Sequence, residues 1–149
     1  LAYIQPVFID LDMNTVEPAV GARRMDKIYA WKSMLDMGIH ASGGSDAPVV
    51  SFDAMENIYF AVTRKNIKGQ PEEGWIPSEK MSVDEAVKLF TKNAAYASYT
   101  EKENGTIETG KNADLVVLEK DIYSIDPDEI KTVKVDMTVL GGKVVFERE

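Results

Sequence analysis

The first half of the chain changes between two patterns of apolar residues. Residues 2–9 are mostly apolar and rich in β-forming residues, which is typical of a strand buried on both faces. Pro6 cannot donate a ladder hydrogen bond, so we expect it at the C-terminal end of this strand. A polar loop is predicted at residues 10–18. From Val20 to Met37 apolar residues recur at helical spacing, and Gly38 stands where a helix commonly ends.

The same order of elements follows a second time. Residues 39–43 predict another short strand, and Ser51 is placed to cap a helix whose apolar face includes Phe52 and Met55. Strands and helices that alternate with short connections are typical of parallel strands joined by right-handed crossovers. Because two such units cannot close a sheet by themselves, we interpret residues 1–65 as the last quarter of a barrel.

The next segment is a loop followed by a helix. Residues 65–80 are polar and interrupted by glycine and proline, which indicates a loop. Ser82 and Glu85 have the spacing of a capping box, and an apolar stripe continues from there to Ala97. We therefore predict one helix over this stretch.

The chain becomes β-rich after Gly105. Residues 113–118 predict a short strand, and Asp126-Pro127 begins a helical turn with proline at its first position. Residues 133–140 alternate between apolar and polar side chains. Gly141-Gly142 is a two-residue hairpin turn that leads into a returning strand at residues 144–146.

Composition and charge exclude several classes of function. The 149 residues are 44% hydrophobic, which is enough for one compact domain with a core. With 25 acidic and 17 basic residues the formal charge is −8, which argues against binding nucleic acid or an anionic membrane surface. No apolar run approaches the length of a membrane span, and the N-terminus lacks the features of a signal peptide.

The chain contains no cysteine and a single histidine. Disulfides, thiolate metal sites and cysteine nucleophiles are therefore excluded, and the composition fits the cytoplasm. An active site in this chain must rest on carboxylates or on ligands from elsewhere. Leu1 lies directly in a strand-like run without an initiator methionine, which we interpret as a boundary within a longer protein.

Asp46 is the main candidate for chemistry, because Gly43-Gly44-Ser45-Asp46 follows the second predicted strand immediately. In parallel barrels the active site lies at the C-terminal ends of the strands. The two glycines allow a sharp turn and leave room for a ligand. Taken alone, such an aspartate is more often a turn or capping residue that binds its own backbone. Its position after a strand favours a catalytic role.

Three segments further along the chain, at residues 91–95, 105–118 and 139–145, together resemble the amidohydrolase superfamily. In that superfamily a segment with the pattern G-x-I-x-x-G-K-x-A-D-L-V-V-L leads from the barrel into a small β-sandwich. The chain carries this pattern at residues 105–118, and residues 91–95 and the hairpin at residues 139–145 are similar to the neighbouring segments of the superfamily. The upstream half is similar to the group that contains N-substituted formamide deformylases. The segments that carry this second similarity are Gln5-Pro6, residues 29–35, residues 44–49 and residues 61–64.

The resemblance implies an α/β fold with two parts. Residues 1–100 would form the C-terminal part of a metal-dependent hydrolase TIM barrel, with strands seven and eight and their helices. Residues 101–149 would supply the C-terminal strands of a small β-sandwich. The final hairpin and the two barrel strands would have open neighbours in this chain, so we expect a homo-oligomer or a swapped assembly.

The resemblance also implies a mechanism. Asp46 would touch a divalent metal, zinc in most such enzymes, take a proton from the attacking water and pass it to the leaving nitrogen. The other ligands would be histidines, and a lysine or glutamate, on earlier strands that this chain lacks. Since a catalytic zinc usually takes three protein ligands, we expect residues 1–149 alone to be inactive and to bind no metal tightly.

Other polar residues have simpler interpretations. His40 lies six residues before Asp46, near the opposite end of the strand, and is interpreted as structural.

Asp10 has some chance of contacting substrate, although a solvated loop is the main expectation for it and for Asp12. Arg23, Arg24 and Arg64 are candidate partners of an acidic substrate or of carboxylates at the barrel rim, and surface salt bridges are the expectation for all three. Ser45 is not a nucleophile, because no G-x-S-x-G elbow is present. Trp31 and Met34 belong to the core, and Lys111 and Asp114 to the entry of the sandwich.

The sequence therefore predicts part of an enzyme. The whole protein would hydrolyse a non-peptide C–N bond in a small-molecule amide, with an N-substituted formamide as the favoured substrate. Cyclic amide opening or deamination is the alternative within this class. A non-catalytic binding or scaffold domain with the same architecture is the alternative outside it.

Overall fold

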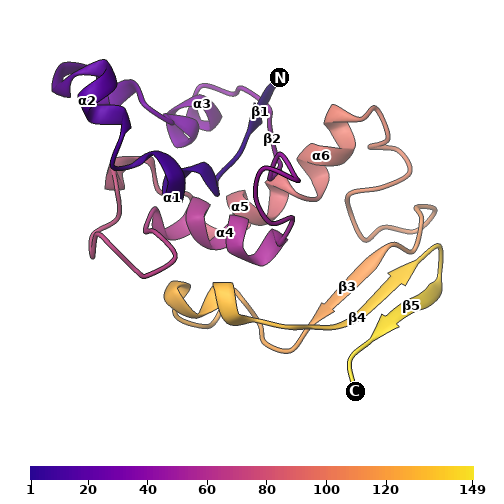
Figure 1. The fold of residues 1–149 in the computed structure, drawn as a ribbon. Helices are drawn as coiled ribbons and strands as arrows, with labels where there is room; N and C mark the ends of the chain where they lie inside the picture. Colours follow the sequence, from indigo (N-terminus) through magenta and orange to yellow (C-terminus); the bar gives the residue numbers. More distant parts are fainter.

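Two short parallel strands lie in the N-terminal half of the computed structural model, which describes residues 1–149 (Figure 1). Strand β1 (Ala2–Ile4) pairs with β2 (Ala41–Gly43), and Ala2 lies opposite Ala41. The predicted parallel arrangement is confirmed. The helices between the strands make the crossover, as expected for consecutive parallel strands.

Strand β1 is shorter than the predicted strand at residues 2–9, and it is not buried on both faces, because Tyr3 is exposed. The chain turns at Pro6, where the amides of Phe8 and Ile9 donate to the carbonyl oxygens of Gln5 and Pro6. Helix α1 (Phe8–Asp12) begins there, in the place of the strand end and of the predicted loop. Proline cannot extend a ladder, and its fixed φ favours a turn.

The single helix predicted from Val20 to Met37 is divided into two pieces, a 3₁₀ helix (Ala22–Lys27) and helix α3 (Trp31–Asp36). Helix α2 (Val16–Val20) comes before them, in the place of the end of the predicted loop. Gly21 has a φ of 82°, which ends α2 because a right-handed helix cannot continue through it. Gly38, at φ 77°, ends the last piece as predicted.

Helix α4 (Ala54–Thr63) is the most buried helix, with eight of its ten residues buried. Its N-cap is Asp53, whose carboxylate accepts from the amides of Met55 and Glu56, and not the predicted Ser51. Phe52 therefore lies outside the helix and is 87% exposed, so its predicted place on the apolar face is wrong. An aspartate one residue before the helix competes well with serine for the exposed amides.

Residues 65–80 form the predicted loop, with a 3₁₀ turn at Pro77–Glu79. The predicted capping box is confirmed at the start of helix α5 (Val83–Leu89), because the Ser82 hydroxyl accepts from the amide of Glu85 and the Glu85 carboxylate accepts from the amide of Ser82. The chain then breaks at Thr91, which has non-helical angles. Helix α6 (Lys92–Ala97) follows as a separate element.

The C-terminal part is an antiparallel sheet of strands β3 (Leu115–Leu118), β4 (Val135–Leu140) and β5 (Lys143–Glu147), with the order β3-β4-β5. The predicted Gly141-Gly142 hairpin and the predicted turn after Pro127 (Pro127–Thr132, 3₁₀) are both present. Lys111 and Asp114 have structural contacts, as expected. The Lys111 ammonium donates to Thr106 Oγ1, and the Asp114 carboxylate accepts from the amide of Gly141.

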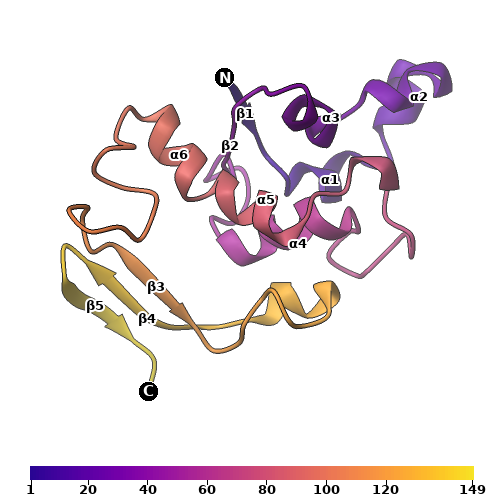
Figure 2. The same cartoon turned by 180° about the vertical axis from the view of Figure 1, so that it is seen from behind.

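Figures 1 and 2 show the sheet β3-β4-β5 beside the helical part, with the two termini at opposite sides of the molecule. The core gathers around α4, and Ile122, Ile130 and Val133 from the C-terminal part join it. The strand β5 is exposed along its whole length and pairs only with β4, so its outer edge is open. Self-association through this edge stays a prediction, and so does the domain boundary at residue 100.

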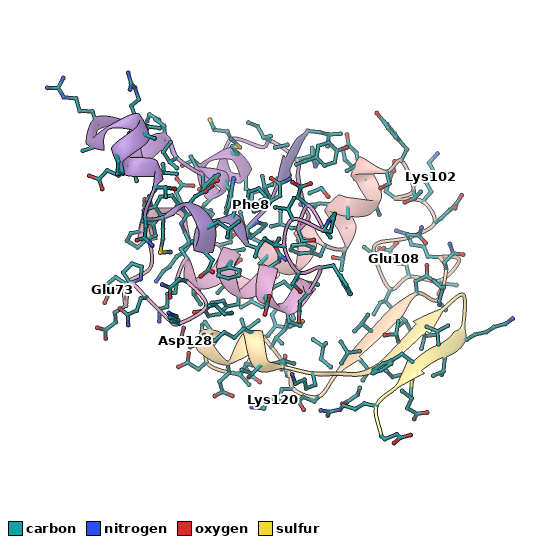
Figure 3. All side chains as sticks on the ribbon, viewed as in Figure 1. Phe8, Glu73, Lys102, Glu108, Lys120 and Asp128 are labelled. Carbon is teal, nitrogen blue, oxygen red and sulfur yellow. The ribbon has the colours of Figure 1, made fainter.

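The labelled charged side chains Glu73, Lys102 and Glu108 lie on the outside of the molecule (Figure 3). No helix combines the length and the apolar character that crossing a membrane requires.

Candidate active site

Asp46 lies in the loop at residues 44–53, three residues beyond the C-terminal end of β2. Its backbone is left-handed, with a φ of 58°, and its carbonyl oxygen accepts from the amide of Val49 at 2.9 Å. The residue is exposed, and its carboxylate has no hydrogen-bond or ion-pair partner within the chain. The backbone of Asp46 thus lies in a turn, while its carboxylate does not bind local amides as a capping aspartate would. The catalytic role of Asp46 stays a prediction.

The entry of this loop is held against β1 and α5. The amide of Gly44 donates to the carbonyl oxygen of Ile4 at 2.9 Å. Gly43 packs against the ring of Phe90, so closely that a Cβ atom at position 43 would lie 2.5 Å from Cζ of that ring. The absence of a side chain at Gly43 therefore lets α5 approach the end of β2.

Replacing Gly43 with alanine should lower the free energy of unfolding by about 1–3 kcal/mol, because the added methyl group must displace the Phe90 ring in a packed core. Urea unfolding followed by circular dichroism measures this loss. The double variant Gly43→Ala/Phe90→Leu should lose less than the sum of the two single variants. Additive losses would show that the two residues are not in contact.

Asp10 and Asp12 both have partners within the chain. The Asp10 carboxylate on α1 accepts from the amide of Ile67 at 2.8 Å and so holds the loop at residues 65–80. The Asp12 carboxylate accepts from the Tyr29 hydroxyl, and burial together with this bond raises the pKa of Tyr29 above its usual value. The interpretation of both as residues of a solvated loop is therefore wrong. Contact between Asp10 and a substrate stays a prediction.

His40 lies just before β2 and stacks its ring on Tyr96, with 4.5 Å between the ring centroids. Its carbonyl oxygen accepts from the amide of Ala2, at the end of the strand pair opposite to Asp46. Both contacts agree with the structural interpretation.

Arg64 is the largest departure from the sequence-based expectations, because it is fully buried and forms no surface salt bridge. Its Nε donates to the carbonyl oxygen of Trp75 at 2.7 Å and its Nη1 to that of Tyr29 at 3.1 Å, while Nη2 has no partner. The guanidinium also lies over the rings of Trp31 and Trp75, at 5.3 and 5.6 Å from their centroids. Burial lowers the pKa of Arg64 to about 10, and Glu79 opposes this shift, so the group is charged at neutral pH.

Glu79 joins the same region to α3. The residue is 5% exposed, and its carboxylate accepts from the amide and the hydroxyl of Ser33 in the first turn of α3. It thereby caps a helix whose own N-cap residue, Ala30, has no side-chain acceptor. Trp31 is buried and Met34 packs on the core, as predicted.

Asn57 is a functional candidate that the sequence patterns did not single out. It lies on α4, is 1% exposed, and its amide joins the loops that follow β1 and β2. The available signal was a polar residue inside the apolar run of this helix, between Met55 and Ile58.

The donor groups of the chain do not make a metal site by themselves. No three histidine, aspartate or glutamate side chains lie close enough together to hold an ion. A free carboxylate at a strand end suits a divalent metal as one ligand, and Asp46 is the residue of this loop that offers it. The remaining ligands would have to come from outside residues 1–149.

The structure thus defines a mixed α/β protein with parallel strands, a free carboxylate just beyond one strand end and a separate antiparallel sheet. The sequence matches the amidohydrolase family over residues 1–146, and the chain belongs to that family.

Two relatives illustrate the similarity. The amidohydrolase YtcJ of Bacillus subtilis is 37% identical over 97% of this chain, and the N-substituted formamide deformylase of Arthrobacter pascens is 36% identical over 82% of it. The matched regions span only 27% and 22% of those two proteins, so the chain corresponds to about a quarter of their length.

A solved structure supports the fold. The chain is similar to an uncharacterized metal-dependent hydrolase from Pyrococcus horikoshii, with a TM-score of 0.72 and 23% identity over 84% of this chain and 25% of that one. The likeness shows that the arrangement of helices and strands described above occurs within a larger protein of known structure.

Proposed function

We propose that residues 1–149 belong to a longer metal-dependent amidohydrolase, called the full-length protein below, which hydrolyses a non-peptide C–N bond. In this proposal β1 and β2 are the last two strands of its TIM barrel, and β3-β4-β5 completes a small β-sandwich. The observation that carries the proposal is the free, exposed carboxylate of Asp46 just beyond β2. An N-substituted formamide is the favoured substrate because of the similarity to the Arthrobacter enzyme.

The chemistry assigned to Asp46 is proton transfer. A carboxylate within hydrogen-bond reach of a water molecule accepts its proton as the water attacks the amide carbon, and then donates that proton to the leaving nitrogen. A bound divalent metal, which we propose to be zinc, would lower the pKa of a bound water molecule far below its bulk value, towards neutrality. Asp46 makes no competing bond inside the chain, so it is available for both transfers.

The full-length protein, loaded with zinc, tests this proposal. It should release formate and a primary amine from an N-substituted formamide, and removal of the metal by a chelator should stop the reaction. If the protein opens a cyclic amide or deaminates its substrate instead, the proposed substrate is wrong but the protein is still a hydrolase of C–N bonds. No hydrolysis of any of these substrates would favour a binding or scaffold protein.

Residues 1–149 alone should show no hydrolysis of N-substituted formamides and no tight zinc binding, since one carboxylate cannot replace the three protein ligands usual at a catalytic zinc. Isothermal titration with zinc and a formate assay on the purified chain measure both properties. Turnover by the isolated chain would place the complete site within it and contradict the proposed architecture.

A further inference from the structure

Asn57 is a buried amide with a partner for each of its two polar atoms. Its Oδ1 accepts from the backbone amide of Val7 at 3.2 Å, and its Nδ2 donates to the carbonyl oxygen of Asp53 at 3.0 Å. Val7 belongs to the turn after β1, and Asp53 ends the loop after β2. The bond to Asp53 lies within the first turn of α4, whose N-cap is Asp53, and the bond from Val7 ties this turn to the turn after β1.

The polar character of Asn57 calls for an explanation, because its neighbours on α4 are apolar and its exposed fraction is 1%. Burying an amide gains little for stability even when it is bonded, whereas leaving it unbonded costs about 1–3 kcal/mol. An apolar residue at position 57 would leave the amide of buried Val7 without its acceptor. What asparagine adds is a fixed geometry between Val7 and Asp53.

The first turn of α4 is also where the loop that carries Asp46 ends. The loop is fixed at its entry by the bond from Gly44 to Ile4, and at its exit by the helix cap at Asp53. Between these ends Asp46 has only the turn bond from Val49. The position of Asp46 relative to the turn after β1 therefore depends on how the exit of the loop is held.

We propose that Asn57 is a positioning residue for Asp46, which holds the exit of the Asp46 loop against the turn after β1 through its two amide bonds. The inference rests on the proposed role of Asp46. Asn57 touches neither substrate nor metal in this account. It fixes the backbone from which the reacting carboxylate projects.

The test compares Asn57→Ala with Thr63→Val in the full-length protein. Thr63 is also buried on α4 and bonds the carbonyl oxygen of Tyr59 and the amide of Lys65, so its loss removes hydrogen bonds on the same helix, away from the loop. Asn57→Ala should lower kcat about 10- to 100-fold with little change in KM, because small misplacements of a reacting group have effects of this size. Thr63→Val should keep kcat close to that of the wild type. Equal effects of the two variants on kcat would overturn the proposal.

Asn57→Asp supplies a second test if Asn57→Ala does not fold. The introduced carboxyl group can accept from Val7, but it can donate to Asp53 only when protonated. Burial raises the pKa of such a group, so the ratio of variant to wild-type kcat should fall as the pH rises between about 5 and 8. Circular dichroism at each pH verifies that both proteins are folded. A ratio that does not change with pH would contradict the inference.

Failure of this inference and failure of the proposed function give different results. If Asp46→Asn keeps its activity, the proposed role of Asp46 is wrong, whatever Asn57 does. If Asp46→Asn is inactive while Asn57→Ala behaves like Thr63→Val, the proposed function stands and only the positioning role of Asn57 is wrong.

Discussion

Replacing Asp46 with asparagine in the full-length protein should lower kcat about 10²- to 10⁴-fold, the range that one proton-transferring side chain contributes. Asparagine keeps the size of the side chain but cannot take up a proton. The exposed position of Asp46 and its lack of partners in the chain mean that the substitution removes no stabilising contact. In residues 1–149 alone the unfolding midpoint should therefore not change, and in the full-length protein the loss should appear in kcat measured at saturating zinc.

Steady-state kinetics with an N-substituted formamide measure this effect, and Asp84→Asn is the matched control. Asp84 is an exposed carboxylate in the first turn of α5 that pairs with Lys88. It should be replaced without loss of kcat. If Asp46→Asn retained most of its activity in a folded, metal-loaded protein, another group would have to move the proton.

Replacing Arg64 with alanine should lower the free energy of unfolding of residues 1–149 by about 3–5 kcal/mol, as for other buried charged groups whose removal leaves a partner unpaired. The variant leaves the carbonyl oxygens of Tyr29 and Trp75 without their donor and removes the cation beside buried Glu79. It also opens a cavity between two tryptophan rings.

Urea unfolding of the chain measures this loss, with Arg23→Ala as the control, because Arg23 is exposed. Arg23→Ala should change the unfolding free energy by less than about 0.5 kcal/mol, as is usual at the surface. Similar losses for the two arginines would show that the burial of Arg64 contributes nothing to stability.

The features that the sequence predicts well depend on residues close together in the chain. The capping box uses Ser82 and Glu85, three residues apart, and Gly141-Gly142 defines its own hairpin. The parallel strands follow from the order of short apolar runs, although β1 ends earlier because Pro6 turns the chain. The predicted long helix is interrupted where Ile28 is extended and Tyr29 has a positive φ, which a count of apolar positions does not reveal.

The features that the sequence does not predict depend on contacts between distant segments. Arg64 follows α4 and has the pattern of a surface residue, but its partners Tyr29 and Trp75 come from two other segments. Glu79 caps a helix 46 residues away in the chain. No local pattern identifies such pairs, because they form only when the segments pack.

The sequence identifies one residue of the candidate site, Asp46, and does not identify the residues around it. Glycines after a strand and the position of Asp46 are visible in the sequence, and the structure leaves that carboxylate free. The sequence pattern does not identify Asn57, because a single polar residue in an apolar helix has many explanations until its two partners are known. The other metal ligands would lie outside the chain, so no reading of residues 1–149 could identify them.

A crystal structure of the metal-loaded full-length protein, with the metal located by its anomalous scattering, is the most direct measurement of the central claim. The proposal predicts a carboxylate oxygen of Asp46 within about 2.0–2.2 Å of the metal, the usual distance for a zinc–carboxylate bond. A fully ligated metal elsewhere, with the Asp46 carboxylate bonded to the backbone of its own loop, would contradict it.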